Sequence, residues 1–129
     1  MIVADASWVV ALRDAHDDHH RQAAAVNRDI NDEDVLLHPV TLAECLVAPA
    51  QLGALQDATL RLRAAFDVPV VEREAPVRWA ALRARTGLRL PDAIVLDTAI
   101  SHQARAIATF DARLAASAHT HGLDVLGPP

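Results

Sequence analysis

Apolar residues along the 129-residue chain alternate between short β-branched runs and longer stretches with helical spacing. A β-branched run bounded by polar residues favours a strand, whereas apolar residues recurring every three or four positions favour a helix. The pattern predicts strands at 2–4, 35–37, 68–71 and 106–110, with a possible edge strand at 124–126. It predicts helices over 7–13, 21–30, 41–47, 52–66, 76–85 and 91–103, and a short last helix from 111.

Short strands separated by helices are typical of β-α-β units. We therefore expect an α/β fold: a three-layer α/β/α sandwich around a central, mostly parallel sheet of four to five short strands. No repeat or Gly/Ser-rich linker divides the pattern, so residues 1–129 are expected to form one domain. Functional groups in such sheets gather beyond the carboxyl ends of the strands.

Composition excludes several kinds of chemistry. The chain has 12 basic residues, all Arg, and the absence of Lys excludes a Schiff base or a P-loop. A single cysteine, Cys45, excludes an internal disulfide and a cysteine-based zinc site, and it favours a reducing compartment. The first residues are acidic and no apolar run reaches about 18 residues, so we expect a cytoplasmic protein without a membrane span. The net charge of −5 argues against non-specific binding to phosphate backbones.

Four carboxylates stand where a functional site is expected. Asp5 and Asp111 follow predicted strands, Asp92 opens an apolar helix, and Glu44 lies in an otherwise apolar helix. Taken singly, each Asp also suits a helix N-cap, and Glu44 also suits the exposed face of a helix. Gathered in one pocket, the four would repel and raise one another's pKa values. A hard divalent cation such as Mg²⁺ or Mn²⁺ would relieve that repulsion, so the set is interpreted as a metal site.

The segments around these acids resemble the four acidic motifs of PIN domains. They are VADAS at 3–7, LAE at 42–44, RLPDA at 89–93 and TFD at 109–111. The chain is similar, more narrowly, to VapC-type toxins of toxin–antitoxin pairs, in motif order and spacing over essentially its whole length. One departure is Phe110, because many relatives have Asn before the last Asp.

The resemblance implies a metal-dependent endoribonuclease that needs Mg²⁺ or Mn²⁺. Its catalytic and metal-binding residues would be Asp5, Glu44, Asp92 and Asp111. Ser7 and Thr109 match hydroxyl residues that would orient carboxylates or water. The implied partners are an RNA substrate, a cognate VapB-type antitoxin and a second copy of the chain in a homodimer.

Two other function classes were weighed against the ribonuclease. A non-catalytic PIN-like module that binds RNA or protein remains the alternative, although such a module has no need of four acids. Receiver domains and haloacid-dehalogenase-like phosphatases use a lysine near the phosphoryl group, and this chain has none.

Five of the arginines fall within residues 73–89, just before Asp92. They fit either a solvated helix face or a strip that contacts substrate phosphates, with Arg85 and Arg89 as the best candidates for the latter. Asp97 lies five positions after Asp92, roughly 140° around a helix, and is therefore left out of the metal site.

Other residues have two interpretations. The HDDHH run at 16–20 fits a solvated turn better than a transition-metal site. Trp8 and Trp79 fit core or interface positions, although Trp79 beside arginines also fits a stacking platform for RNA. Cys45 fits a small buried apolar residue.

Overall fold

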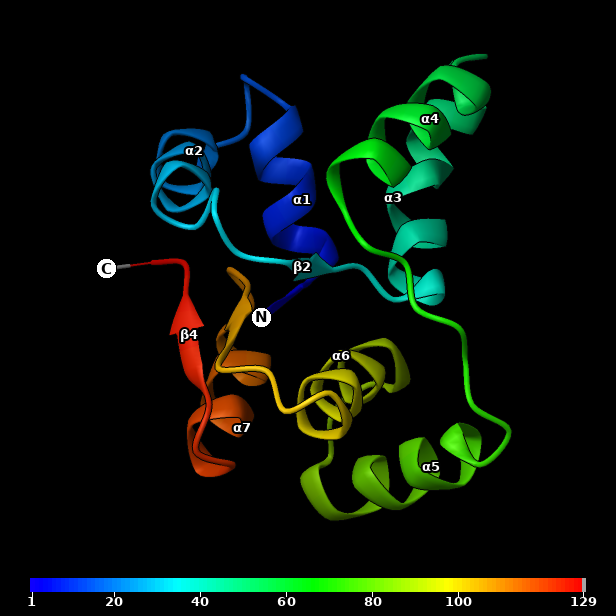
Figure 1. The fold of residues 1–129 in the computed structure, drawn as a ribbon, viewed down its shortest axis with the longest axis vertical. Coiled ribbons are helices and arrows are strands. Elements are labelled where there is room, and N and C mark those ends of the chain that lie inside the picture. The colour runs from blue at the N-terminus through cyan, green and yellow to red at the C-terminus, as the bar shows by residue number, and fades with distance from the viewer. Residues whose placement is uncertain (129) are drawn as a thin grey trace.

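The computed structural model describes residues 1–128 and shows a parallel sheet between two layers of helices (Figure 1). The strands are β1 (Ile2–Ala4), β2 (Val35–Leu36), β3 (Ala106–Ala108) and β4 (Asp124–Leu126). Their order is β2-β1-β3-β4, and every neighbouring pair is parallel. The predicted α/β sandwich is confirmed, and its sheet is parallel throughout.

Seven helices connect and flank these strands in the described residues. They are α1 (Ala6–Arg13), α2 (His20–Asp29), α3 (Pro39–Gln51), α4 (Leu55–Ala65), α5 (Ala75–Thr86), α6 (Leu90–Ser101) and α7 (Ala112–Thr120). The predicted helices are confirmed with shifted ends. The largest shift is in α3, which ends at Gln51 instead of 47 and begins at Pro39 instead of 41. At its start, His38 Nδ1 accepts the backbone N–H of Val40 at 3.0 Å.

The alternation of side chains along β1 and β3 divides the core into two halves. Ile2, Ala4, Ala106 and Ala108 face α1 to α4 and pack with Trp8 and Leu62. Val3 and Ile107 face the other way and pack with residues of α5, α6 and α7. Because strand side chains alternate with a period of two, each central strand contributes to both cores and is buried on both faces.

The predicted strand at 68–71 does not form. The chain makes one parallel bridge beside β2, between Leu36 and Asp67, and then leaves the sheet. Pro69 has no N–H to donate to a ladder, and the side chain of Val70 is 92% exposed. A β-branched composition is therefore not sufficient to form a strand at 68–71. The segment would have to pair with β2, and β2 itself pairs over only two residues.

No helix within residues 1–128 is long and apolar enough to span a membrane.

Candidate active site

The two central strands bring Asp5 and Asp111 to the same edge of the sheet. Asp5 follows β1, and its backbone N–H donates to the carbonyl oxygen of Ala108, the last residue of β3, at 2.9 Å. Thr109 and Asp111 follow at the end of β3. Since β1 and β3 run parallel, their carboxyl ends coincide, and residues from both ends of the chain meet there.

The Asp5 carboxylate is fixed by two hydroxyl groups. Its Oδ2 accepts a hydrogen bond from Ser7 Oγ at 2.7 Å and another from Thr109 Oγ1 at 2.8 Å. The two hydroxyls also hold the next turn, because Ser7 Oγ accepts the N–H of Phe110 and Thr109 Oγ1 accepts the N–H of Asp111. Asp5 occupies the N-cap position of α1, yet its side chain makes no capping hydrogen bond. Its carboxylate is thus positioned toward the end of β3.

Asp111 does cap the helix that follows it. Its Oδ1 accepts the backbone N–H groups of Arg113 and Leu114 at 2.9 and 3.0 Å. The other oxygen, Oδ2, lies 4.0 Å from a guanidinium nitrogen of Arg89. The N-cap interpretation is therefore correct for Asp111, and it occupies only one of the two carboxylate oxygens.

Asp92 lies in the first turn of α6, whose N-cap is Arg89. It is buried, and desolvation raises the pKa of its carboxyl above the ordinary value. The negative charges of Asp111 and Asp5 raise that pKa further, and Arg89 partly opposes them. The Nε of Arg89 lies 3.6 Å from Asp92 Oδ2, and the Arg89 side chain is 74% exposed. Asp92 therefore has acids as near neighbours and one loosely held cation.

Glu44 approaches the same acids from α3. It is an exposed residue, but partial desolvation of its carboxyl raises the pKa, and the charges of Asp5 and Asp92 raise it further. Arg89 acts in the opposite direction. The two interpretations of Glu44, an exposed helix residue and a member of the acidic site, are thus compatible. Glu44 lies on the exposed face of its helix and is also within electrostatic range of two buried aspartates.

These four acids share one electrostatic environment without forming a closed ligand shell. As the side chains stand, no three His, Cys, Asp or Glu groups in residues 1–128 lie close enough to hold one metal ion. What they offer is a set of carboxylate oxygens with a single flexible counterion. Oxygen donors of this kind suit a hard divalent cation.

The family of the chain follows from its sequence as a whole. A model of the PIN domain family matches residues 2–125. The chain belongs to the PIN domain family. A search of curated proteins found no match.

Solved structures share the fold of this PIN domain at low sequence identity. A toxin–antitoxin complex from Klebsiella pneumoniae is 22% identical, with a TM-score of 0.73 over 90% of this chain and 91% of that one. VapC20 from Mycobacterium tuberculosis, described as a toxin that cleaves the sarcin–ricin loop, is 19% identical, with a TM-score of 0.73 over 91% and 95%. FitAcB from Neisseria gonorrhoeae is 19% identical, with a TM-score of 0.72 over 99% and 98%.

The arginines within residues 73–89 of this PIN domain fall into two groups: some bond to other protein groups, and others are exposed. Arg78 pairs with Asp97 and Glu72, and Arg83 donates to the carbonyl oxygen of Leu88 at 2.7 Å. Arg89 faces the acids, whereas Arg85 is exposed at the end of α5 and forms no ion pair within residues 1–128. The strip is therefore not one continuous phosphate-binding surface.

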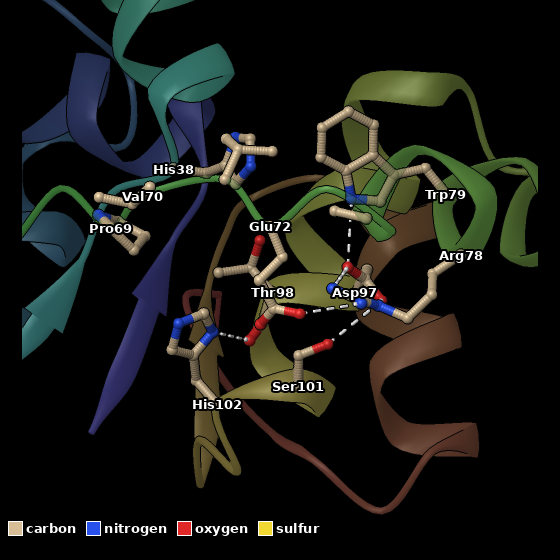
Figure 2. Close-up of a pocket in the computed structure, with 12 residues that line it drawn as sticks. His38, Pro69, Val70, Glu72, Arg78, Trp79, Asp97, Thr98, Ser101 and His102 are labelled. Carbon is tan, nitrogen blue, oxygen red and sulfur yellow. Dashed lines mark hydrogen bonds and ion pairs between the residues drawn. The ribbon is translucent and has the colours of Figure 1, made fainter.

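Asp97 belongs to a separate pocket between α5 and α6 (Figure 2). Its carboxylate accepts hydrogen bonds from Arg78 Nε at 3.0 Å, Trp79 Nε1 at 3.1 Å and Ser101 Oγ at 3.3 Å. The ring of His38 packs edge-on against Trp79. The indole of Trp79 is thus engaged inside the protein, and the sequence did not reveal this role because its partners lie on another helix.

Trp8, Cys45 and the run at 16–20 have structural roles. Trp8 and Cys45 are buried in the core, and burial raises the pKa of the Cys45 thiol to about 12. In the 16–20 run, the backbone N–H groups of His16 and His19 bond to the side chains of Asp14 and Asp17, as in a turn.

Proposed function

We propose that this PIN domain is a metal-dependent endoribonuclease, the toxin of a type II toxin–antitoxin pair. The observation that carries the proposal is the gathering of Asp5, Glu44, Asp92 and Asp111, in which desolvation and then the neighbouring acids raise the pKa of Asp92 and Glu44. A group of like charges with two buried members, Asp5 and Asp92, is costly unless a ligand of opposite charge compensates it.

The metal would be held by the four carboxylates, and Mg²⁺ or Mn²⁺ fits their all-oxygen donor set. When bound, such an ion activates water and offsets the charge of the scissile phosphodiester. Glu44 is exposed and Arg89 is loosely held, so both side chains are free to rotate as the cation binds.

The protein residues around the carboxylates have distinct tasks in this proposal. Ser7 and Thr109 direct both of their hydrogen bonds to Oδ2 of Asp5, which fixes the plane of that carboxylate. Asp111 uses Oδ1 as a helix cap and keeps Oδ2 for the site. Arg89, released from the acids, would contact substrate phosphate, and Arg85 would contact it farther along the RNA.

The structural neighbours support RNA as the substrate and an antitoxin as the partner. One neighbour is described as a toxin that cleaves the sarcin–ricin loop, and another as a toxin–antitoxin complex. We extend to this chain an RNA substrate, a cognate VapB-type antitoxin, a homodimeric state and a cytoplasmic location.

A cleavage assay tests the proposal directly. Purified protein is incubated with total RNA and Mg²⁺ or Mn²⁺, and the cut ends are mapped. Cleavage is expected for the wild type, and it should disappear with EDTA or with Asp5→Asn. Asp57→Asn is the matched control, because Asp57 is 69% exposed on α4 and pairs only with Arg61 among the described residues.

Metal binding provides a second measurement that does not depend on activity. Calorimetric titration with Mn²⁺ should show binding to the wild type and to Asp57→Asn, and much weaker binding to Asp5→Asn. Cleavage that persists unchanged in EDTA would contradict the metal mechanism. Metal binding without cleavage of any RNA would instead favour the non-catalytic PIN-like module.

A further inference from the structure

Two aromatic rings stack beside the acidic site. The ring centroids of His19 and Phe110 lie 4.4 Å apart, and the ring planes are inclined by only 8°. His19 directly precedes α2, and Phe110 lies between Thr109 and Asp111 at the end of β3. The contact therefore joins the turn at 16–20 to the last acidic motif, the two features that the proposed mechanism leaves without a role.

Phe110 is the anchored member of the pair. Its backbone N–H donates to Ser7 Oγ at 3.0 Å, and its partly buried side chain packs against the core beneath α1 and α2. Its Cα is one residue, about 3.8 Å, from that of Asp111. Phe110 thus directly precedes a proposed metal-binding residue, and its backbone is tied to the Ser7 hydroxyl that also bonds Asp5.

His19 is the outer member of the pair. It is exposed, and its Nδ1 lies 3.2 Å from Oε1 of Gln22, while its backbone N–H donates to Asp17 at 2.8 Å. An exposed side chain normally samples several rotamers. Here the Phe110 ring and the Gln22 amide both restrain the imidazole, which leaves one ring face toward solvent in a defined orientation.

We propose that His19, supported by Phe110, is a stacking platform for a nucleobase of the RNA near the scissile phosphate. The proposal rests on the ribonuclease function proposed above. Aromatic side chains bind unpaired bases by stacking, and every base offers a flat face for this contact.

The charge of the protein makes such a platform useful. The chain carries a net charge of −5, and the site is lined by carboxylates, so electrostatic attraction contributes little to RNA affinity away from the metal. Stacking involves no phosphate and releases no counterions. The contribution of His19 should consequently be insensitive to salt, unlike that of Arg85 or Arg89.

The experiment compares RNA binding by proteins that all carry Asp92→Asn, with and without a further substitution. The proposed function requires Asp92 for cleavage, so these proteins should leave the RNA probe intact. The probe is a fluorescent single-stranded RNA containing the cut site mapped for the wild type, and affinity is measured by anisotropy at several salt concentrations. Adding His19→Ala should weaken binding about tenfold, by the same factor at each salt concentration. His19→Phe should retain the affinity because it retains a ring.

Two controls separate stacking from charge and from folding. His16→Ala removes an exposed imidazole from the same turn, where no ring stacks on it among residues 1–128, and should leave affinity unchanged. An RNA with an abasic site at the stacked position should bind the His19→Ala protein and its parent equally. Thermal unfolding should give similar midpoints for the two proteins.

The outcomes distinguish the stacking proposal from the ribonuclease proposal on which it rests. If the wild type cleaves RNA but His19→Ala binds the probe as tightly as its parent, the stacking proposal is wrong and the ribonuclease function stands. The same conclusion follows if the loss vanishes at high salt or is matched by His16→Ala. If the wild type cleaves no RNA, the ribonuclease function fails and the platform fails with it.

Discussion

Two aspartates on one helix have opposite surroundings. Asp92 and Asp97 both lie on α6, and their side chains are 10% and 9% exposed. Asp97 accepts hydrogen bonds from a guanidinium, an indole and a hydroxyl group. Asp92 is surrounded by other carboxylates and by an arginine whose Nε is 3.6 Å away.

The difference shows that two equally buried aspartates can have opposite electrostatic surroundings. A buried carboxylate that is fully bonded inside the protein stabilises the fold and has little capacity left for a ligand. One that faces other carboxylates and only a loosely held cation retains its capacity for a metal ion. The composition of the neighbourhood, more than the depth of burial, separates the two aspartates.

The largest expected effect is the loss of cleavage in Asp92→Asn. Removing one metal ligand should lower the RNA cleavage rate by about a thousandfold, because metal-ion stabilisation of the transition state amounts to several kcal/mol. Initial rates with Mg²⁺ measure it. Asp97→Asn is the matched control, with the same substitution on the same helix. An equal loss of rate per folded molecule in both variants would remove the distinction between the two acids.

Thr109→Val should have the next largest effect. The substitution removes the hydroxyl that donates to Asp5 and accepts from the N–H of Asp111. Loss of such supporting hydrogen bonds weakens metal affinity by about 10- to 100-fold. Calorimetry with Mn²⁺ measures it. Thr98→Val is a control of comparable burial and should leave metal affinity intact, since among residues 1–128 Thr98 Oγ1 bonds only the Ile94 carbonyl of its own helix.

Asp97→Asn should destabilise the fold by about 2 kcal/mol. Breaking a fully buried pair costs about 3–5 kcal/mol, and the value is reduced here because Arg78 is 37% exposed. Urea unfolding followed by circular dichroism measures the change. The same measurement on Asp92→Asn should show no comparable loss, and a destabilisation of similar size there would contradict the contrast between the two sites.

The smallest expected effect concerns pH and metal in the folded protein. The raised pKa of Asp92 means that its ionisation opposes folding, so the contribution of this carboxyl to metal-free stability should fall as pH rises above its ordinary pKa of 3.8. Asp92→Asn should lessen that fall. Metal at about 10 times its Kd should stabilise the wild type by about 1.4 kcal/mol at neutral pH, and the variant much less. Thermal scans with and without Mn²⁺ check both statements.

The sequence predicted most of the fold because its strands and helices are locally marked. β1 and β3 are apolar runs that end at polar residues, and α6 begins at a Leu-Pro-Asp turn. The segment at 68–71 has the same β-branched composition but lacks a long partner, since β2 pairs over only two residues. Strand formation depends on that partner, which local composition does not describe.

The sequence marks the candidate acids by their positions, whereas it does not predict their contacts. Asp5, Asp92 and Asp111 were marked by their positions at strand ends and at a helix start. The partners of Asp97 come from α5, and the ring on Phe110 comes from the turn before α2. Such pairs arise from helix packing and chain reversal, which no spacing in one segment encodes.

The hydrogen bond between Thr109 and Asp5 joins residues 104 positions apart and has a consequence for synthesis. At typical translation speeds of about 5–20 residues per second, the N-terminal strand waits roughly 5–20 s before its central partner is made. The carboxylate cluster therefore has no assembled form on a partly translated chain. The proposed ribonuclease would therefore be inactive on the ribosome at least until Asp111 has been synthesised and has left the exit tunnel.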